Sequence, residues 1–197
     1  VDTVTGSRHL LKTDLHRVLV DCGLYQGVKS LRRRNWAAFP EEPASIDAVL
    51  LTHGHIDHSG YLPVLVKHGF KGRIHCTRST FELCRILLPD AGHLQEEDAR
   101  YANRKQFSRH HPAEPLFTVE DAWRALEQFE PHGFDESFSP VDDITASFSP
   151  AGHILGSACI RVCHGGKTII FSGDVGRQKD PLMRAPTPLA DTDYLVL

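Results

Sequence analysis

The sequence predicts a layered α/β fold in which strands and helices are partly segregated, as in α+β domains, and three observations support this. Short apolar stretches closed by Gly, Asp or His recur in both halves of the chain, as expected for buried strands. Between about residues 79 and 130 the spacing becomes helical, and residues that favour helices are abundant. A composition of 41% hydrophobic and 24% charged residues over 197 positions is enough to bury a core. We therefore expect one domain, or a large part of one, with a helical insert between two groups of strands.

The first group of strands is predicted from three stretches. Residues 17–20 are mainly apolar and precede Asp21-Cys22-Gly23, which predicts a strand and then a turn. Residues 47–52 predict a second strand, and its successive apolar positions indicate burial on both faces. Residues 58–68 have helical spacing and end before a glycine, and residues 73–77 predict a third strand.

The middle of the chain predicts three helices. Residues 79–88 and 91–105 have helical spacing or composition. A further helix is expected to begin after Thr118, a residue type that favours the N-cap position. Residues 108–115 contain two prolines and predict a loop.

The second group of strands follows Pro131. Its members are expected at residues 144–148, 158–163, 168–171 and 194–197. Gly165-Gly166 predicts a hairpin between the second and third of them. The last stretch is apolar and is expected to be buried. Because the chain stops inside it and does not begin with Met, we expect a fragment of a longer protein.

Composition excludes several classes of protein. A net charge of -3 argues against a globally basic nucleic-acid coat, although it leaves room for a local basic groove. No apolar stretch approaches the roughly 18 residues needed to span a membrane, and no secretory signal is visible. Five scattered cysteines without a C-x-x-C pair predict no disulfide framework. A reducing, cytoplasmic location is therefore expected.

The densest chemical motif lies directly after the buried strand that ends at Thr52. The sequence His53-Gly54-His55-Ile56-Asp57-His58 places three imidazoles and a carboxylate within six residues, a density typical of metal ligands. Gly54 allows a tight turn, so that His53 and His55 can face one ion. Asp57 and His58 then lie where the next helix begins and can face a second ion.

Three other polar residues also follow predicted strands and have a glycine nearby. Asp21 follows residues 17–20, His153 follows the strand near Phe148, and Asp174 follows the strand that ends at Phe171. Because α/β sheets place their ligand sites at strand ends, we expect these side chains to meet the histidines of the motif.

The motif H-x-H-x-D-H, followed by G-H and then S-G-D, resembles the metallo-β-lactamase superfamily. The sequences at residues 4–10, 21–27, 151–158 and 172–176 are similar to those of its β-CASP branch. That branch includes RNA-processing nucleases, among them the endonuclease subunit of the pre-mRNA cleavage and polyadenylation machinery and its prokaryotic relatives. The helical stretch at residues 88–129 is similar to the segment found there in prokaryotic members.

The resemblance implies the N-terminal portion of an αββα sandwich that binds two zinc ions. His53, His55 and His153 would hold one ion and Asp57 and His58 the other, while Asp174 would bridge both. Asp21 would bind no metal itself but would hold one ligand histidine in place. Asp57 and Asp174 are then the expected catalytic carboxylates, and Asp57 would orient a shared hydroxide or accept its proton. The β-CASP domain and the C-terminal part of the metallo-β-lactamase domain are expected to lie outside residues 1–197.

The function implied is zinc-dependent cleavage of phosphodiester bonds in single-stranded RNA, by a protein that could form a homodimer; this fragment alone is expected to be inactive. Two alternatives stay open, namely another hydrolase of the superfamily (a thioesterase or lactonase) and a catalytically silent β-CASP subunit. A basic segment near Trp36 could contact an RNA backbone or could be an ordinary solvated surface. It contains Lys29, Arg32, Arg33 and Arg34.

Overall fold

The computed structural model describes residues 5–189 and 191–197. Over these residues the strands form two five-stranded sheets. The first sheet has the order β1-β2-β3-β4-β5, and only β1 and β2 are antiparallel. Its strands are His9–Lys12 (β1), Arg17–Val20 (β2), Ala48–Leu50 (β3), Arg73–Thr77 (β4) and Phe129–His132 (β5).

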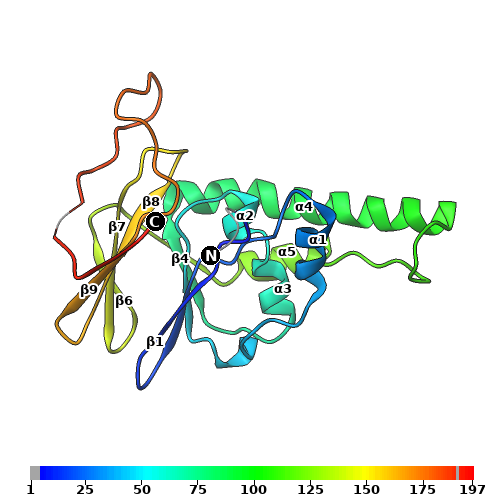
Figure 1. Cartoon of the computed structure of the whole chain (residues 1–197), viewed down its shortest axis with the longest axis horizontal. Coiled ribbons are helices and arrows are strands. Elements are labelled where there is room, and N and C mark those ends of the chain that lie inside the picture. The colour runs from blue at the N-terminus through cyan, green and yellow to red at the C-terminus, as the bar shows by residue number, and fades with distance from the viewer. Residues whose placement is uncertain (1–4, 190) are drawn as a thin grey trace.

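The second sheet has the order β10-β9-β8-β7-β6 and lies face to face with the first (Figure 1). Strands β6 to β9 form an antiparallel meander, and β10 pairs in parallel with β9. They are Ser137–Val141 (β6), Ile144–Pro150 (β7), Ala158–His164 (β8), Lys167–Phe171 (β9) and Tyr194–Val196 (β10). The predicted Gly165-Gly166 hairpin joins β8 to β9, and both glycines have positive φ.

Successive side chains of a strand point to opposite faces of the sheet, and this divides the buried residues into two main clusters. In β2, Leu19 packs with the helix-side core, whereas Val18 and Val20 face the second sheet. The helices on the outer face of the first sheet include Leu62–Lys67 (α3), Arg78–Lys105 (α4) and Val119–Leu126 (α5). The inter-sheet core adds Ile144, Ala146, Phe148, Ile160 and Val162 from the second sheet. Helices, first sheet and second sheet are thus three successive layers of the predicted sandwich.

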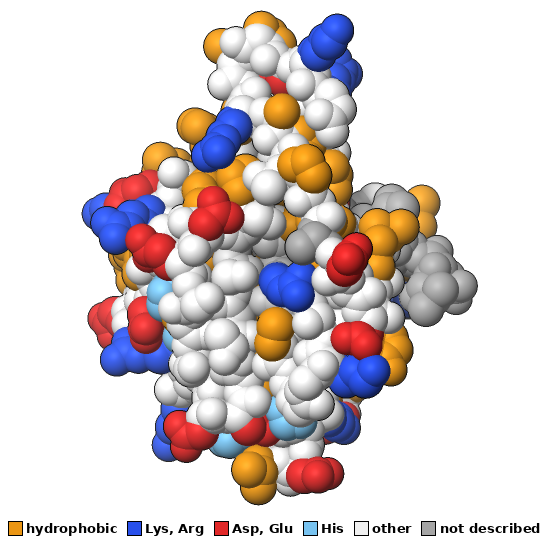
Figure 2. All heavy atoms as spheres, turned by 90° about the vertical axis from the view of Figure 1, so that its left-hand side faces the viewer, with side chains coloured by type: hydrophobic (Ala, Val, Ile, Leu, Met, Phe, Trp, Pro, Cys, Tyr) orange, Lys and Arg blue, Asp and Glu red, His pale blue; other side chains and the backbone are white. Residues whose placement is uncertain are grey.

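The second sheet lies on the left in Figure 1, and Figure 2 looks onto that side of the molecule. Uncharged polar side chains and backbone make up much of this surface, and charged side chains lie mainly toward its edges. A small cluster of Ala151, Cys159 and Ile170 is buried behind it.

The helices differ from the predictions in two places. The single helix expected at residues 58–68 is instead two short helices, Ile56–Ser59 (α2) and α3, because the chain turns at Gly60 and Tyr61. The two helices expected at 79–88 and 91–105 are one helix, α4, which continues through Pro89 and extends beyond the rest of the fold (Figure 1). Burial of α4 side chains such as Cys84 and Leu88 offsets the roughly 3 kcal/mol cost of an internal proline.

The N-cap prediction at Thr118 is confirmed. Its side chain accepts from the backbone N–H of Asp121, and the Asp121 carboxylate accepts from the backbone N–H of Thr118, forming a capping box. The remaining short helical segments are Lys29–Arg32 (α1), Arg33–Trp36 (η1) and Pro43–Ser45 (η2).

Four strands also differ from the predictions. Strands β1, β5 and β6 were not predicted, and β5 contains Pro131, which an edge strand tolerates because one row of its backbone groups has no partner strand. The strand expected to be buried at the end of the chain is instead exposed: Tyr194 is 59% and Leu195 47% exposed. The prediction of burial there was wrong.

Candidate metal centre

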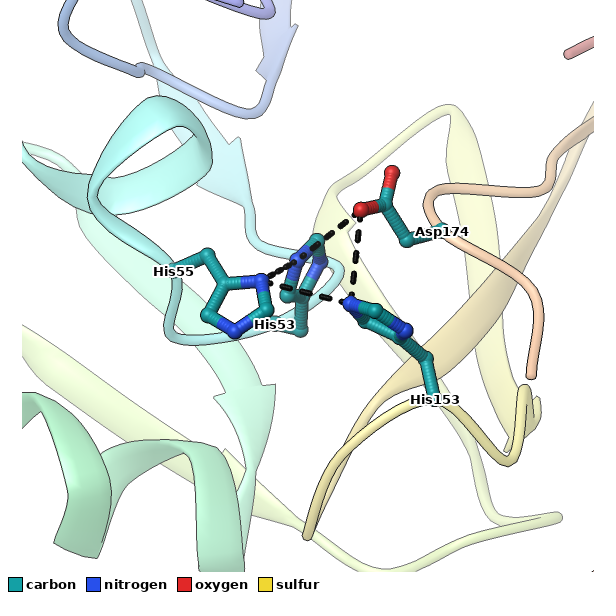
Figure 3. A group of neighbouring side chains, drawn as sticks. All are labelled: His53, His55, His153 and Asp174. Carbon is teal, nitrogen blue, oxygen red and sulfur yellow. Dashed lines mark hydrogen bonds and ion pairs between the residues drawn. The ribbon is translucent and has the colours of Figure 1, made fainter. Parts of the chain in front are cut away.

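Four predicted ligands converge at the edge of the sandwich where β3, β7 and β9 end. His53 and His55 follow β3, His153 lies in the loop after β7, and Asp174 follows β9, so each sheet contributes two (Figure 3). Each offers one ligand atom, and the four atoms lie within 4.8 Å of one another.

The separations between ligand atoms are those of a coordination shell. His53 Nε2 lies 3.1 Å from His55 Nδ1, which is 3.3 Å from His153 Nε2. Asp174 Oδ2 lies 3.4 Å from His153 Nε2 and 3.9 Å from His53 Nε2. An ion about 2.1 Å from each of four tetrahedral ligands separates those ligands by roughly 3.4 Å. Three imidazole nitrogens and one carboxylate oxygen therefore fit a divalent metal of the zinc type.

His58 is held by a hydrogen-bonded carboxylate on its far side. Asp21 Oδ2 lies 2.7 Å from His58 Nδ1, which leaves His58 Nε2 directed toward Asp174 Oδ1 at 3.5 Å. Thr52 donates its backbone N–H and its hydroxyl to Asp21, at 2.8 and 2.9–3.0 Å. Asp21 is 2% exposed, so this network fixes the histidine inside the protein. The predicted Asp21–histidine contact is present, and the histidine is His58.

Asp174 is placed to face two groups of ligands. One oxygen faces His53 and His153, and the other faces His58. Its side chain is 45% exposed, so its position is reachable from solvent. Asp57 is partly buried and close enough for its charge to act on His55 and His58. It is not among the four converging side chains, so its role as a ligand stays a prediction.

Two glycines allow the ligand-bearing loops to approach the neighbouring backbone. A Cβ at Gly23 would lie 1.5 Å from the carbonyl oxygen of Asp57, and one at Gly176 would lie 1.8 Å from that of Gly152. The backbone N–H of Cys22 donates to the carbonyl of His58 at 2.7 Å, which fixes this approach. Gly23 and Gly176 supply no ligand themselves. Because each contacts the backbone beside a ligand-bearing residue, a residue with a side chain does not fit at either position.

The electrostatics favour neutral rings at the first group of ligands. Burial, together with the rings of His58, His55 and His153, lowers the pKa of His53 to about 2. Burial and His153 also lower the pKa of His55. Burial acts against charge on His58 as well, but the hydrogen bond and charge of Asp21, with Asp174 and Asp57, raise its pKa. Neutral His53 and His55 have lone pairs available for a cation near pH 7.

The comparison with family models agrees with this geometry, since residues 6–195 match the model of the metallo-beta-lactamase superfamily. The chain belongs to the metallo-beta-lactamase superfamily. It is 37% identical over 190 residues to ribonuclease TTHA0252 of Thermus thermophilus, covering 95% of this chain and 39% of that protein. It is 31% identical over 173 residues to cleavage and polyadenylation specificity factor subunit 3-I of Arabidopsis thaliana, covering 85% of this chain and 22% of that protein.

These relatives are of the β-CASP RNA-processing branch, as the sequence motifs predict, and the chain corresponds to their N-terminal part. It spans well under half of the length of either relative. Among solved structures, a metallo-beta-lactamase with the HARLDQ motif from Cronobacter sakazakii superposes with a TM-score of 0.51. It is 20% identical, and the match covers 86% of this chain and 53% of that one. That similarity confirms the fold.

Sequence reasoning missed one cluster and left one surface undecided. His75 and His132, which no sequence motif singles out, lie together with Glu130 on neighbouring strands. The basic residues 29 and 32–34 are exposed on α1 and η1. Lys29, Arg32 and Arg33 line a groove with Trp36, Ile56 and the C-terminal half of α4.

Among the described residues, no helix is both long and apolar enough to cross a membrane.

Proposed function

We propose that this chain forms the metal-binding part of a zinc-dependent nuclease that hydrolyses phosphodiester bonds in single-stranded RNA. The observation that carries this proposal is the meeting of three imidazoles and Asp174 beside the His58–Asp21 pair. Two similar proteins are named for RNA cleavage or for the cleavage and polyadenylation machinery, which supports RNA as the substrate class.

In this proposal the chain would hold two zinc ions. His53, His55 and His153 would hold one ion, Asp57 and His58 would hold the other, and Asp174 would serve as a ligand to both. When bound, such a pair of ions polarises a phosphoryl oxygen and stabilises the charge that develops on the attacking and leaving oxygens. Because most of the proposed ligands are neutral imidazoles, the centre keeps a net positive charge that an anionic phosphodiester can meet.

Three carboxylates of the chain are proposed to orient the ligands and the attacking water and to hold or accept protons. Asp174, half-exposed and facing both ligand groups, aligns them relative to each other. Asp57 lies next to His58 in sequence and orients the attacking water or accepts its proton. Asp21 keeps the proton of His58 on Nδ1, so that Nε2 presents its lone pair toward the site.

The groove lined by α1 and η1 is proposed as the adjoining RNA path. Ile56, one of its lining residues, lies in the chain between His55 and Asp57, so the groove adjoins the ligand loop. Lys29, Arg32 and Arg33 offer positive charge to phosphates, and Trp36, 62% exposed, offers a ring for base stacking. We further propose a cytoplasmic location, which suits the five free cysteines, and a homodimer stays a prediction.

The proposal is tested on the whole protein that contains this chain. Elemental analysis is expected to find close to two zinc ions per chain, and Asp174→Ala is expected to abolish cleavage of a single-stranded RNA. The matched control is Asp142→Ala, an exposed carboxylate on the β6–β7 hairpin, which should leave cleavage unchanged. A single bound ion, or activity of Asp174→Ala within tenfold of the unmodified protein, would contradict the dinuclear assignment.

The two alternative functions predict different results in the same assays. A thioesterase or lactonase of the superfamily would turn over its ester substrate and leave RNA intact. A silent subunit would bind zinc weakly or not at all, since such subunits lose metal ligands. The presence of the first ligand group in one cluster favours an active site over a silent one.

A further inference from the structure

A second cluster of metal-ligand side chains lies in the first sheet, away from the motif. His75 is on β4, and Glu130 and His132 are on the neighbouring edge strand β5. Ile74, Cys76 and Phe129 pack into the helix-side core, so the residues that alternate with them lie on the opposite face of the sheet. The parallel register pairs His75 with Glu130 and Thr77 with His132, which brings the three side chains together.

The ligand atoms of this cluster have the spacing of a coordination shell. His75 Nδ1 lies 2.9 Å from His132 Nε2. Glu130 Oε1 lies 3.9 Å from each of these nitrogens. These values bracket the roughly 3.4 Å that separates tetrahedral ligands of a zinc ion. Glu130 is half-exposed, so a solvent molecule can complete the shell.

Packing holds both rings in place. His132 stacks on Phe138 of β6 with ring centroids 3.8 Å apart and an angle of 9° between the planes. His75 is 4% exposed and its ring lies 5.2 Å from the same phenylalanine. Burial lowers the pKa of His75 to about 4 and also lowers the pKa of His132, so both rings are neutral near pH 7.

The nitrogens of the two rings that face each other share one contact, and Glu130 Oε1 lies near both of them. The other nitrogen of His75, Nε2, is buried without a partner among the described residues and is not one of the proposed ligand atoms. Arg73 competes for Glu130, but its Nε lies 3.9 Å from Oε2, so Oε1 remains directed at the imidazoles.

We propose that His75, Glu130 and His132 form a second, separate site for a divalent metal of the zinc type. It shares no ligand with the centre formed by His53, His55, His153 and Asp174. Two imidazoles and a carboxylate with one open position match the ligand types that zinc accepts. A bound ion ties β5, which pairs only with β4 among the described strands, to the interior of the sheet.

The test uses zinc alone as the probe, in a chain whose first centre is removed by His55→Ala and Asp174→Asn. Calorimetric titration of this double variant is expected to show one remaining zinc site. Adding Glu130→Gln, which keeps the shape and removes the charge, should weaken that site more than about 100-fold. Losing only a ligand's hydrogen-bond partner already costs about 10–100-fold. Adding His93→Ala instead, which removes an exposed histidine of α4, should leave the affinity unchanged.

Hydrogen exchange gives an independent readout. Zinc should slow amide exchange in β5 of the double variant and should have no such effect once Glu130→Gln is added. The proposal is overturned if the double variant binds no zinc, or if Glu130→Gln leaves both the affinity and the exchange unchanged. His132→Ala serves as a further variant, and Glu130→Gln remains informative if that change prevents folding, because Glu130 is half-exposed.

Discussion

Replacing Asp21 by Asn should change the chemistry of His58 with almost no change in shape. Oδ1 of Asp21 accepts the backbone N–H of Thr52 at 2.8 Å, so this position must be an oxygen in the variant as well. The amide NH₂ of Asn then faces His58 Nδ1, where Asp21 Oδ2 now lies at 2.7 Å. Because an NH₂ group donates, His58 must accept at Nδ1 and carry its proton on Nε2.

In the variant the proton of His58 lies on Nε2, the atom that is expected to bind the metal. His58 Nε2 lies 3.5 Å from Asp174 Oδ1, and once protonated it offers no lone pair to an ion there. Loss of a ligand's hydrogen-bond partner typically costs about 10–100-fold in metal affinity or activity. Each tenfold corresponds to about 1.4 kcal/mol, so the expected loss of binding free energy is about 1.4–2.7 kcal/mol.

The assay is a zinc titration by calorimetry, with RNA cleavage measured on the whole protein. We expect the weaker of two zinc sites to lose 10–100-fold in affinity and cleavage to fall in parallel. Asp135→Asn is the matched control, because Asp135 also has a positive φ (60°, against 58° for Asp21) but is exposed on a turn. Unchanged zinc affinity in Asp21→Asn would refute the argument that this carboxylate sets the tautomer of His58.

Four further predictions follow from the same structure. Gly23→Ala should lower both the melting temperature and the zinc affinity, measured by calorimetry, because its Cβ would overlap the carbonyl of Asp57. Thr118→Ala should cost about 1 kcal/mol in chemical denaturation through loss of the capping box; no change would contradict that role. Arg32→Ala should weaken RNA binding and reduce its salt slope by about 0.7, the value for one lost contact to single-stranded nucleic acid. Residues 1–197 alone should not cleave RNA under conditions where the whole protein does, and comparable rates would overturn this expectation.

Much of the site was predictable because its ligands follow strands that are recognisable locally. Asp21, His53 and Asp174 each come within three residues of the end of an apolar stretch and have a glycine nearby, and the structure brings these stretches to one edge. The Thr118 cap was predictable for the same reason, since its partners lie within three residues.

The features that were missed depend on contacts between distant residues. Pro89 does not end α4, because packing of the helix outweighs the local cost of the proline. Pro131 is tolerated because β5 is an edge strand, and edge position depends on the whole sheet order. The contact of His75 with His132 depends on strand register across 57 positions, which no local pattern contains.

The division of the first four ligands between the two sheets has a consequence for folding. His53 and His55 belong to one sheet and His153 and Asp174 to the other, so a bound ion is a cross-link between them. Binding confined to the native state adds RT ln(1 + [M]/Kd) to stability, about 4.1 kcal/mol at a thousandfold excess over Kd. The stability of the contact between the two sheets should therefore rise with the free metal concentration. Chelation should leave the shared core as the main link between them and should lower the protection of the ligand-bearing strand ends against hydrogen exchange.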